Sequence, residues 1–244
     1  PPPAIVYGTP LSATQLDASS PVAGTFTYSP PLGTVLQAGA QTLSATFTPI
    51  DTVHYSTVTT TVPLTVNQAT PVIHWAKLKF IQYGTPVSGS QLNATSSTAG
   101  SFAYGTPLGT VFHAGNHTLS ATFTPTDTVD FAPATATRVL LVKVTKTTTK
   151  LAMTTSVTYA NQSAADFVVT VNPTSGSIPA SGQVTVLTGS TVLCTATLDA
   201  TGVGRCTLSS GQVSVGRHRI SATFAGSADL KASKTRGSAF LTVS

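Results

Sequence analysis

The string TLSATFTP occurs at Thr42–Pro49 and again at Thr118–Pro125, and a shortened form, ISATF, occurs at Ile220–Phe224. Large apolar residues alternate with small or hydroxylated ones in this string, which is the period of a β-strand with one buried face. Because the same strand sequence recurs along the chain, we predict a chain built from repeated β-structural units.

A shift of 76 residues aligns residues 7–55 with residues 83–131 without a gap, and about 31 of the 49 positions are identical. We call these stretches the first and second copies. Turn signals from Gly and Pro separate short alternating runs throughout, which is typical of β-sandwiches. The C-terminal segment does not align at this shift, although it ends in the same strand pattern. We therefore expect an all-β chain of three tandem sandwich domains at 1–68, 69–144 and 145–244, forming an elongated rod.

The composition is poor in charge, with 8% charged residues, and all seven acidic residues are Asp. The formal charge is −2 for residues 1–68 (0 minus 2), +2 for residues 69–144 (4 minus 2) and +5 for residues 145–244 (8 minus 3). The basic residues are spread singly and not interleaved with aromatic residues, so we expect no nucleic-acid partner. No apolar run is long enough to predict a membrane-inserted segment.

The connections between the expected domains are short. Residues 67–71 read NQATP and residues 143–151 read KVTKTTTKL, which predicts semi-rigid joints. The stretch ATPVIHWA at residues 69–76 precedes the second copy and has no counterpart before Pro1, so we expect the first domain to lack its opening strand. Two explanations stay open: a boundary of the sequence, or a strand supplied by a neighbouring subunit through β-augmentation.

Both copies resemble a known family. The strings YGTPLSATQLDA, GTFTY and GTVLQAGAQTLSATFTPIDTVHY, followed by VNQATPVIHW, are similar to bacterial MBG-type repeat domains of surface and secreted proteins. The stretch from GQVTVLTGSTVLC to GRHRISATFAGSADLKAS resembles a bacterial immunoglobulin-like domain of group 3. These resemblances imply immunoglobulin-like sandwiches in surface, adhesin-like or matrix proteins, and no catalytic residues. The sequence at Lys77–Phe80 departs from the pattern of the MBG-type repeat.

Two cysteines, Cys194 and Cys206, flank the turn signal LDATG at Leu198–Gly202 and lie six residues either side of Ala200. In a hairpin centred there they would oppose each other as a non-hydrogen-bonded pair, close enough for a disulfide. We predict this disulfide, with two reduced thiols as the alternative. A disulfide would place the protein outside a reducing compartment.

The histidines raise the question of a metal site. His113 and His117 would face each other in a hairpin centred on Gly115 and could share Zn²⁺ or Ni²⁺. The first copy has Gln37 and Gln41 at these positions, and no third ligand is indicated. We therefore predict a polar cross-strand contact there and expect no cofactor or metal.

Three corner loops combine an acid with a following large side chain, which we interpret as an apolar plug: Asp51 with Tyr55, Asp127 with Phe131, and Asp229 with Leu230. Asp127 and Asp130 are expected to be solvated loop residues that supply too few oxygens for Ca²⁺. No serine lies in a nucleophile-elbow motif, and no paired carboxylates suggest acid–base chemistry.

The sequence thus favours a non-enzymatic structural or adhesive module, extracellular or at the cell surface, that acts as a semi-rigid spacer or display stalk. Two alternatives stay open: a self-assembling filament subunit that uses strand complementation, and a glycan-binding adhesin. The expected partners are other surface proteins, copies of the same chain, or glycans.

Overall fold

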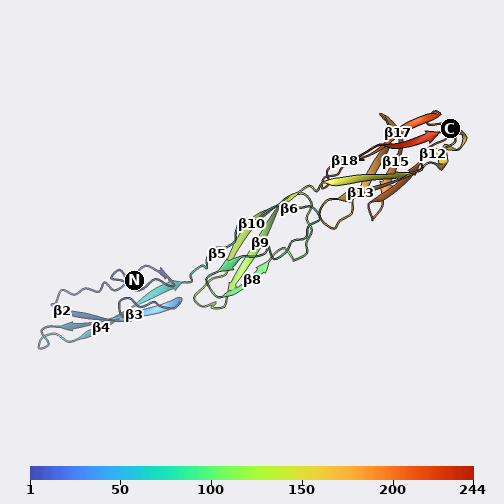
Figure 1. Cartoon of the computed structure of the whole chain (residues 1–244). Coiled ribbons are helices and arrows are strands. Elements are labelled where there is room, and N and C mark those ends of the chain that lie inside the picture. Colours follow the sequence, from blue (N-terminus) through green and yellow to red (C-terminus); the bar gives the residue numbers. More distant parts are fainter. The chain divides into compact units, whose positions relative to one another are not determined.

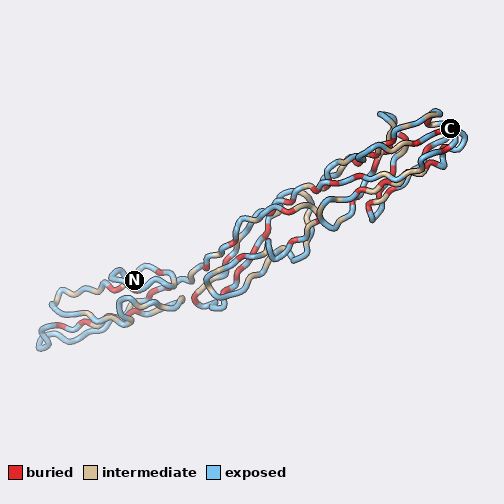
Figure 2. Tube along the Cα trace, viewed as in Figure 1, coloured by how far each residue is buried: buried red, intermediate tan, exposed pale blue.

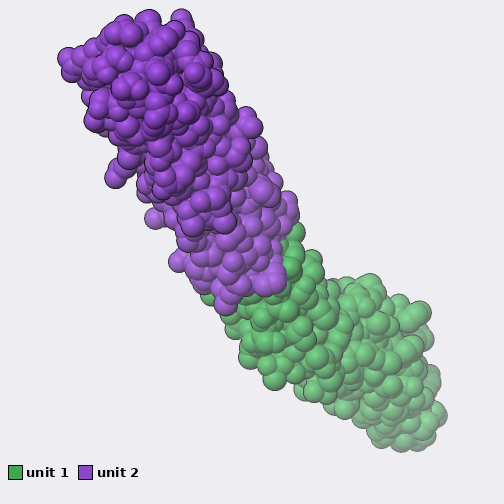
Figure 3. All heavy atoms as spheres, turned by 90° about the vertical axis from the view of Figure 1, so that its right-hand side faces the viewer, with its two compact units in different colours: residues 1–76, 93–105, 120–137 green, residues 77–92, 106–119, 138–244 purple.

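The computed structural model describes all residues from 1 to 244, and strands dominate it from end to end (Figure 1). The chain divides into two compact units, each assembled from separate segments (Figure 3). Unit 1 holds residues 1–76, 93–105 and 120–137, and unit 2 holds residues 77–92, 106–119 and 138–244. The boundary therefore runs through the second copy, and each joint between successive repeats lies inside one unit.

The first copy forms a four-stranded sheet in the order β1-β4-β3-β2. Its strands are β1 (Ile5–Val6), β2 (Gly24–Ser29), β3 (Gly39–Pro49) and β4 (Val58–Asn67). The repeated string lies in β3, where Leu43, Ala45 and Phe47 are buried on one face while Thr46 on the other face bonds Thr59 across the sheet. Buried and exposed positions alternate along the strands (Figure 2). This is the alternation that the string predicts.

The second copy repeats this arrangement in the order β6-β10-β9-β8. Its strands are β6 (Ile81–Gln82), β8 (Gly100–Tyr104), β9 (Gly115–Pro125) and β10 (Ala134–Lys143). It also has a two-stranded sheet of β5 (Ile73–His74) and β7 (Thr95–Ser96), which pair antiparallel. Trp75 follows β5, is 2% exposed and packs edge-on against Tyr104 at 5.7 Å.

The C-terminal segment, within unit 2, contains two sheets that enclose one apolar core. The smaller sheet has the order β11-β13-β16 and the larger has the order β12-β19-β17-β14-β15, with β18 paired to β17. Phe167, Val184 and Phe224 come from β13, β14 and β17 and are almost fully buried between them. The bounds are β11 (Thr147–Met153), β12 (Ser156–Val157), η1 (Tyr159–Ala164), β13 (Asp166–Pro173), β14 (Gly182–Thr188), β15 (Thr191–Leu198), β16 (Val203–Thr207), β17 (Gly216–Phe224), β18 (Ser233–Lys234) and β19 (Ala239–Val243). The prediction of an all-β chain of tandem sandwich domains is confirmed.

The predicted bond between Cys194 and Cys206 is present, with a Cα–Cα separation of 6.0 Å. The expected hairpin setting is wrong, because Cys194 lies on β15 in the larger sheet and Cys206 lies on β16 in the smaller one. The turn at Asp199 carries the chain from one sheet to the other, and its carboxylate accepts hydrogen bonds from the Thr201 and Val203 amides at 2.8 and 3.1 Å. The disulfide therefore ties the edges of the two layers together.

Glycine makes this close approach of the two sheet edges feasible. A Cβ at Gly204 would lie 2.8 Å from the Thr197 carbonyl oxygen and 3.1 Å from the Ala196 Cβ. Because Gly204 has no side chain, β16 can lie close beside β15 two residues before Cys206. The short side chains at this edge bring the two sulfur atoms within bonding distance.

We expect the double substitution Cys194→Ala/Cys206→Ala to lower the unfolding free energy of the C-terminal segment by about 2–3 kcal/mol, because the closed loop is short. Hydrogen exchange of the β17 amides measures this without depending on the other domains. Reductant should lower the wild type to the level of the variant and leave the variant unchanged. Equal protection of the oxidised and reduced wild type would contradict the prediction.

Candidate functional site

Inside unit 1, one buried aspartate joins the two copies. Asp130, in the loop after β9, is only 4% exposed. Its Oδ1 accepts a hydrogen bond of 2.7 Å from the backbone N–H of Ala38, immediately before β3 of the first copy. Its backbone carbonyl accepts a second bond of 2.9 Å from the Ala69 N–H in the linker. One residue of the second copy thus holds both the preceding hairpin and the linker.

The local sequence presents Asp130 in this way. Asp127 Oδ1 accepts bonds from the amides of Val129 and Asp130 at 2.9 and 3.0 Å, a turn typical of a short acidic side chain. The turn directs the next residue, Phe131, against the ring of Tyr7, with the centroids 5.3 Å apart and the planes at 78°. The corner therefore offers a carboxylate and an aromatic ring side by side.

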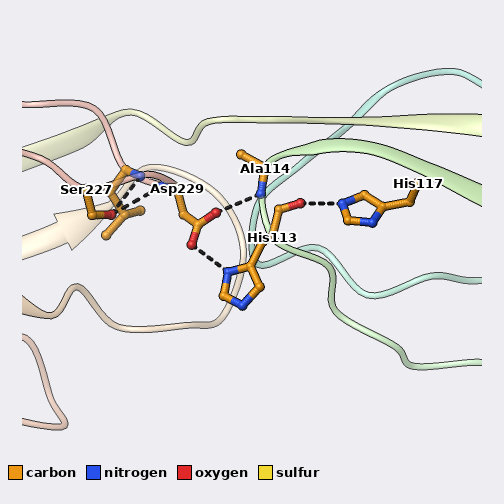
Figure 4. Close-up of polar contacts among 6 residues, drawn as sticks. His113, Ala114, His117, Ser227 and Asp229 are labelled. Atoms are coloured by element: carbon orange, nitrogen blue, oxygen red, sulfur yellow. Dashed lines mark hydrogen bonds and ion pairs between the residues drawn. The ribbon is translucent and has the colours of Figure 1, made fainter.

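Inside unit 2, the same contact joins the second copy to the C-terminal segment. Asp229 Oδ1 accepts a bond of 2.7 Å from the N–H of Ala114, the residue that aligns with Ala38. His113 Nδ1 lies 2.7 Å from Asp229 Oδ2, so both carboxylate oxygens are engaged, as Figure 4 shows. Ser227 Oγ accepts bonds from the amides of Asp229 and Leu230, each at 3.2 Å, in the role that Asp127 has in unit 1.

The linkers at residues 67–71 and 143–151 also take part in the joints. Ala69 forms a parallel β-bridge with Phe131, and Thr145, which aligns with Ala69, forms one with Leu230. The Thr145 hydroxyl also donates to the Tyr83 carbonyl at 2.8 Å. Because each linker is hydrogen-bonded to the repeat that follows it, bending the joint requires breaking backbone bonds as well as the carboxylate contact.

The joint in unit 2 has a further contact between glycines. The N–H of Ser177 donates to the Gly84 carbonyl at 3.3 Å. Gly84 and Gly176 have φ values of +85° and +81°, and a Cβ added to Gly176 would lie 2.8 Å from the Gly84 Cα. Any side chain at Gly176 would therefore push the C-terminal segment away from the second copy.

The half of this contact that donates the backbone N–H occurs a third time, at the end of the C-terminal segment. Tyr7 and Tyr83 each donate a backbone N–H to the carbonyl of the last residue of β4 and β10, at Asn67 and Lys143. Tyr159 donates to the carbonyl of Ser244, the residue after β19. Side-chain nitrogens of Gln41, His117 and His218 each bond the carbonyl four residues earlier. Val215 then holds the place of Ala38 and Ala114. Val215 and Tyr159 are 65% and 48% exposed.

The structure separates the predicted histidine pair. His117 Nε2 contacts the His113 carbonyl at 2.8 Å, while His113 directs its own ring to Asp229 and stacks on Tyr83. The expected contact between facing side chains is therefore replaced by a side-chain to backbone bond and a bond to another domain. Among the 244 residues, no group of three or more His, Cys, Asp or Glu residues is placed to hold a metal ion.

The corner predictions had mixed outcomes. Leu230 is 4% exposed and Phe131 packs on Tyr7, as apolar plugs, but Tyr55 of the first copy is 50% exposed. The expectation that Asp130 is solvated is wrong, because it is buried at the joint. Sequence reasoning missed its role because the partner, a backbone N–H 92 positions away, carries no side-chain signature. The one available signal was an acid directly before the corner hydrophobe in both Asp130-Phe131 and Asp229-Leu230.

The electrostatics of the two joints follow from these contacts. Burial raises the pKa of Asp229, but the bonds from the Ala114 N–H and from His113 outweigh it, so the net pKa lies below the ordinary value of 3.8. The negative charge of Asp130 raises the pKa of Tyr7 above its ordinary value of 10.0. The lowered pKa of Asp229 shows that this joint contact favours the carboxylate form.

Residues 144–244 match the family model of the bacterial Ig-like domain (group 3). The predicted immunoglobulin-like identity of the C-terminal segment is confirmed by this match, while the resemblance of the two copies to MBG-type repeats stays a prediction. No curated protein matches the chain. No helix of the chain has the length and apolar character needed to cross a membrane.

Several solved structures are similar to the chain. Fibronectin(III)-like modules of CbhA from Clostridium thermocellum are 18% identical, with 70% of this chain and 95% of that chain covered and a TM-score of 0.30. The titin I-band fragment I67–I69 is 8% identical, with 100% and 95% covered and a TM-score of 0.39. A Ca²⁺-stabilized adhesin of an ice-binding Antarctic bacterium is 15% identical, with 83% and 57% covered and a TM-score of 0.28.

Acid should open the joint in unit 2. Because the pKa of Asp229 is lowered on folding, its stabilising contribution is complete above the ordinary value of 3.8 and is lost as the pH falls through the lower folded value. We expect the Ala114 amide resonance to shift with a midpoint below 3.8. In the Asp229→Asn variant, which keeps an acceptor oxygen, this transition should be absent. A midpoint above 3.8 in the wild type would contradict the assignment.

Proposed function

We propose that the chain is a non-enzymatic, extracellular structural module that holds successive β-sandwich domains in a restricted orientation, as a semi-rigid spacer or display stalk. The observation that carries this proposal is the repeated aspartate contact, in which Asp130 and Asp229 each bind the backbone N–H before the repeated strand of the preceding repeat. A joint that needs only flexibility would have no reason to engage a carboxylate twice in the same way.

The energetics support a stiff joint. A hydrogen bond to a charged acceptor contributes about 1.5–3 kcal/mol, and a carboxylate left buried without its donor is more costly still. Asp130 also holds the linker through Ala69, so rotation about the linker loses both bonds together. The joint should therefore resist bending until the carboxylate is exposed to water.

Two further observations support the location and the lack of an active site. The disulfide between Cys194 and Cys206 favours an oxidising environment, outside the cytoplasm. The Asp229–His113 pair resembles two members of a catalytic triad, but Ser227 Oγ is hydrogen-bonded to the amides of Asp229 and Leu230 and not to His113. The pair serves the joint.

Removing the carboxylate should loosen the joint in unit 1. We expect Asp130→Ala, with spin labels at the exposed positions Thr27 and Ser101, to broaden the distance distribution between the first and second copies at least twofold. Pulsed electron spin resonance on the full chain measures this distribution. Asp17→Ala, which removes an exposed Asp of the same unit, is the control and should leave the width unchanged. Equal widths in all three proteins would refute the spacer role of Asp130.

A second candidate function, the binding of an acidic glycan, is favoured by a basic groove on the C-terminal segment. The groove has a volume of about 800 Å³ and opens between β11 and the stretch that follows β18. Lys150, Lys234 and Arg236 line it, all are exposed, and none takes part in an ion pair. A neighbouring groove of about 450 Å³ adds Lys143, Lys146 and Lys231. No acidic residue lines either groove.

The floor and rims of the groove suit a hydroxylated polyanion. The Thr147 hydroxyl donates to the Lys231 carbonyl at 2.8 Å and is hydrogen-bonded to Ser233 Oγ at 2.6 Å. Thr149 Oγ1 is hydrogen-bonded to the same Ser233 hydroxyl at 2.7 Å, so the floor is a network of hydroxyls. Among the lining cations, Lys150 lies on β11, and Lys234 and Arg236 lie on β18 and just after it. No aromatic side chain lines the groove, which favours a carboxylated or sulfated glycan over a stacked nucleic acid.

We expect Lys150→Gln/Lys234→Gln/Arg236→Gln to weaken binding of a sulfated polysaccharide at least tenfold, with binding of the wild type falling steeply as salt is raised. The charge-matched control, Lys77→Gln/Lys79→Gln/Arg219→Gln, removes three cations that do not line the groove and should retain the affinity. Calorimetry on the full chain measures both. Equal losses in the two variants, or equal affinity for duplex DNA, would show that only net charge matters and would refute the site.

A further inference from the structure

The smaller of the two basic grooves, of about 450 Å³, lies across the joint in unit 2. Both domains that meet at this joint contribute to it. The lining includes Gln82 and Lys143 from the second copy, Lys146 from the linker, and Thr174 and Lys231 from the C-terminal segment. The groove therefore has its full lining only when the joint is closed.

Backbone contacts within each domain hold the two walls of this groove. In the second copy, β10 pairs with β6 so that Lys143 lies beside Gln82. On the other wall, the Lys231 N–H donates at 2.8 Å to the carbonyl of Thr145, the residue before Lys146. Since each wall is fixed within its own domain, the joint alone sets the distance between them.

The groove collects three cations and no acidic residue. Lys143, Lys146 and Lys231 are exposed, and none takes part in an ion pair. Lys143 Nζ lies 3.5 Å from the centroid of the Phe80 ring, a cation–π contact that restrains this ammonium group. Cations that line one groove repel one another, and salt screens this repulsion without removing it. Closing the joint therefore gathers positive charge that the chain itself does not balance.

The joint in unit 1 has the same backbone contacts without these charges. The uncharged residues Asn67, Thr70 and Ala132 hold the places of Lys143, Lys146 and Lys231. The first two pairs align at the shift of 76 residues. The third pair matches because each residue donates its N–H to the linker, at 2.9 Å from Ala132 and at 2.8 Å from Lys231. The three lysines are thus not required to form a joint of this kind.

We propose that the smaller groove binds sulfate or carboxylate groups of an acidic glycan, and that this binding locks the joint in unit 2. The proposal rests on the second candidate function, in which such a glycan occupies the larger groove. The two grooves adjoin, because Lys146 and Lys231 line the smaller one while the residues that follow them, Thr147 and Ala232, line the larger one. One glycan chain can therefore occupy both grooves.

The coupling between binding and closure follows from the charges. The anionic groups of the glycan neutralise the cations that closure brings together, so the glycan binds the closed joint more tightly than the open one. A ligand with such a preference shifts the equilibrium towards the closed joint. By reciprocity, the closed joint raises the affinity for the glycan by the same factor.

Spin labels at the exposed residues Thr118 of the second copy and Ser190 of the C-terminal segment report on this joint within unit 2. We expect a heparin octasaccharide, added to the full chain, to narrow the distance distribution at least twofold by pulsed electron spin resonance. In Lys143→Gln/Lys146→Gln/Lys231→Gln, the octasaccharide should leave the distribution unchanged. Calorimetry should show that this variant still binds the octasaccharide through the larger groove, with reduced affinity.

Two controls separate the groove from net charge. Lys77→Gln/Lys79→Gln/Arg219→Gln removes three cations that line neither groove, and this variant should narrow as the wild type does. Labels at Thr27 and Ser101 report on the joint in unit 1, where the three lysines are absent. The octasaccharide should leave the width of their distance distribution unchanged.

Reciprocity supplies a second test that needs no label. Asp229→Ala removes the carboxylate that holds Ala114 and also makes the chain more positive, which by itself strengthens binding of a polyanion. Because the open joint no longer completes the groove, we expect this variant to bind the octasaccharide at least fivefold more weakly. Asp17→Ala makes the same charge change outside both grooves and should bind at least as tightly as the wild type.

The outcomes distinguish this proposal from glycan binding itself. Binding of the octasaccharide without narrowing would overturn the locking of the joint and leave glycan binding in place. No binding at all would overturn both. Equal narrowing by inorganic sulfate at the same sulfate concentration, or by sodium chloride at the same ionic strength, would show that a glycan chain is not needed and would overturn its assignment as the ligand.

Discussion

The hydrogen bond from a backbone N–H to an aspartate carboxylate is the interaction on which the arrangement of repeats within each unit depends. Ala38 and Ala114 each precede a glycine of positive φ at the start of a long strand, so their N–H groups point out of the hairpin. A carboxylate satisfies such a donor better than water does, provided that it is held in place. The turns at Asp127 and Ser227 hold it. Hairpin, linker and corner loop therefore form one hydrogen-bonded assembly.

The two joints show that the same kind of hairpin N–H binds the corner loops of two different kinds of domain. The corner at Asp130 comes from a repeat that is nearly a copy of the first, whereas the corner at Asp229 comes from a domain with a different strand order. Both offer a carboxylate followed by a large apolar residue. The same carboxylate contact can thus be made by domains of different topology. Tandem modules of different kinds can therefore be joined in the same way.

Much of the fold could be predicted from the sequence, and the site could not. The alternation in TLSATFTP placed Leu43, Ala45 and Phe47 on the buried face, because strand geometry is local. The partner of Asp130 is a backbone N–H, and nearly every residue has one, so no sequence pattern marks Ala38 as the donor of a joint. The same limit applies to the disulfide. The spacing of Cys194 and Cys206 predicted the bond but also suggested a hairpin, and only the crossover at Asp199 showed that it links two sheets.

The sequence by itself determined the repeat and the β-strand period, since these depend on identity between copies and on neighbours along the chain. The tertiary structure decided which charges are buried and which loops meet. The physical reason is that burial and backbone hydrogen bonding at a joint are properties of surfaces brought together by the fold. Ala38 and Asp130, and likewise Ala114 and Asp229, become neighbours only when the strands between them have paired.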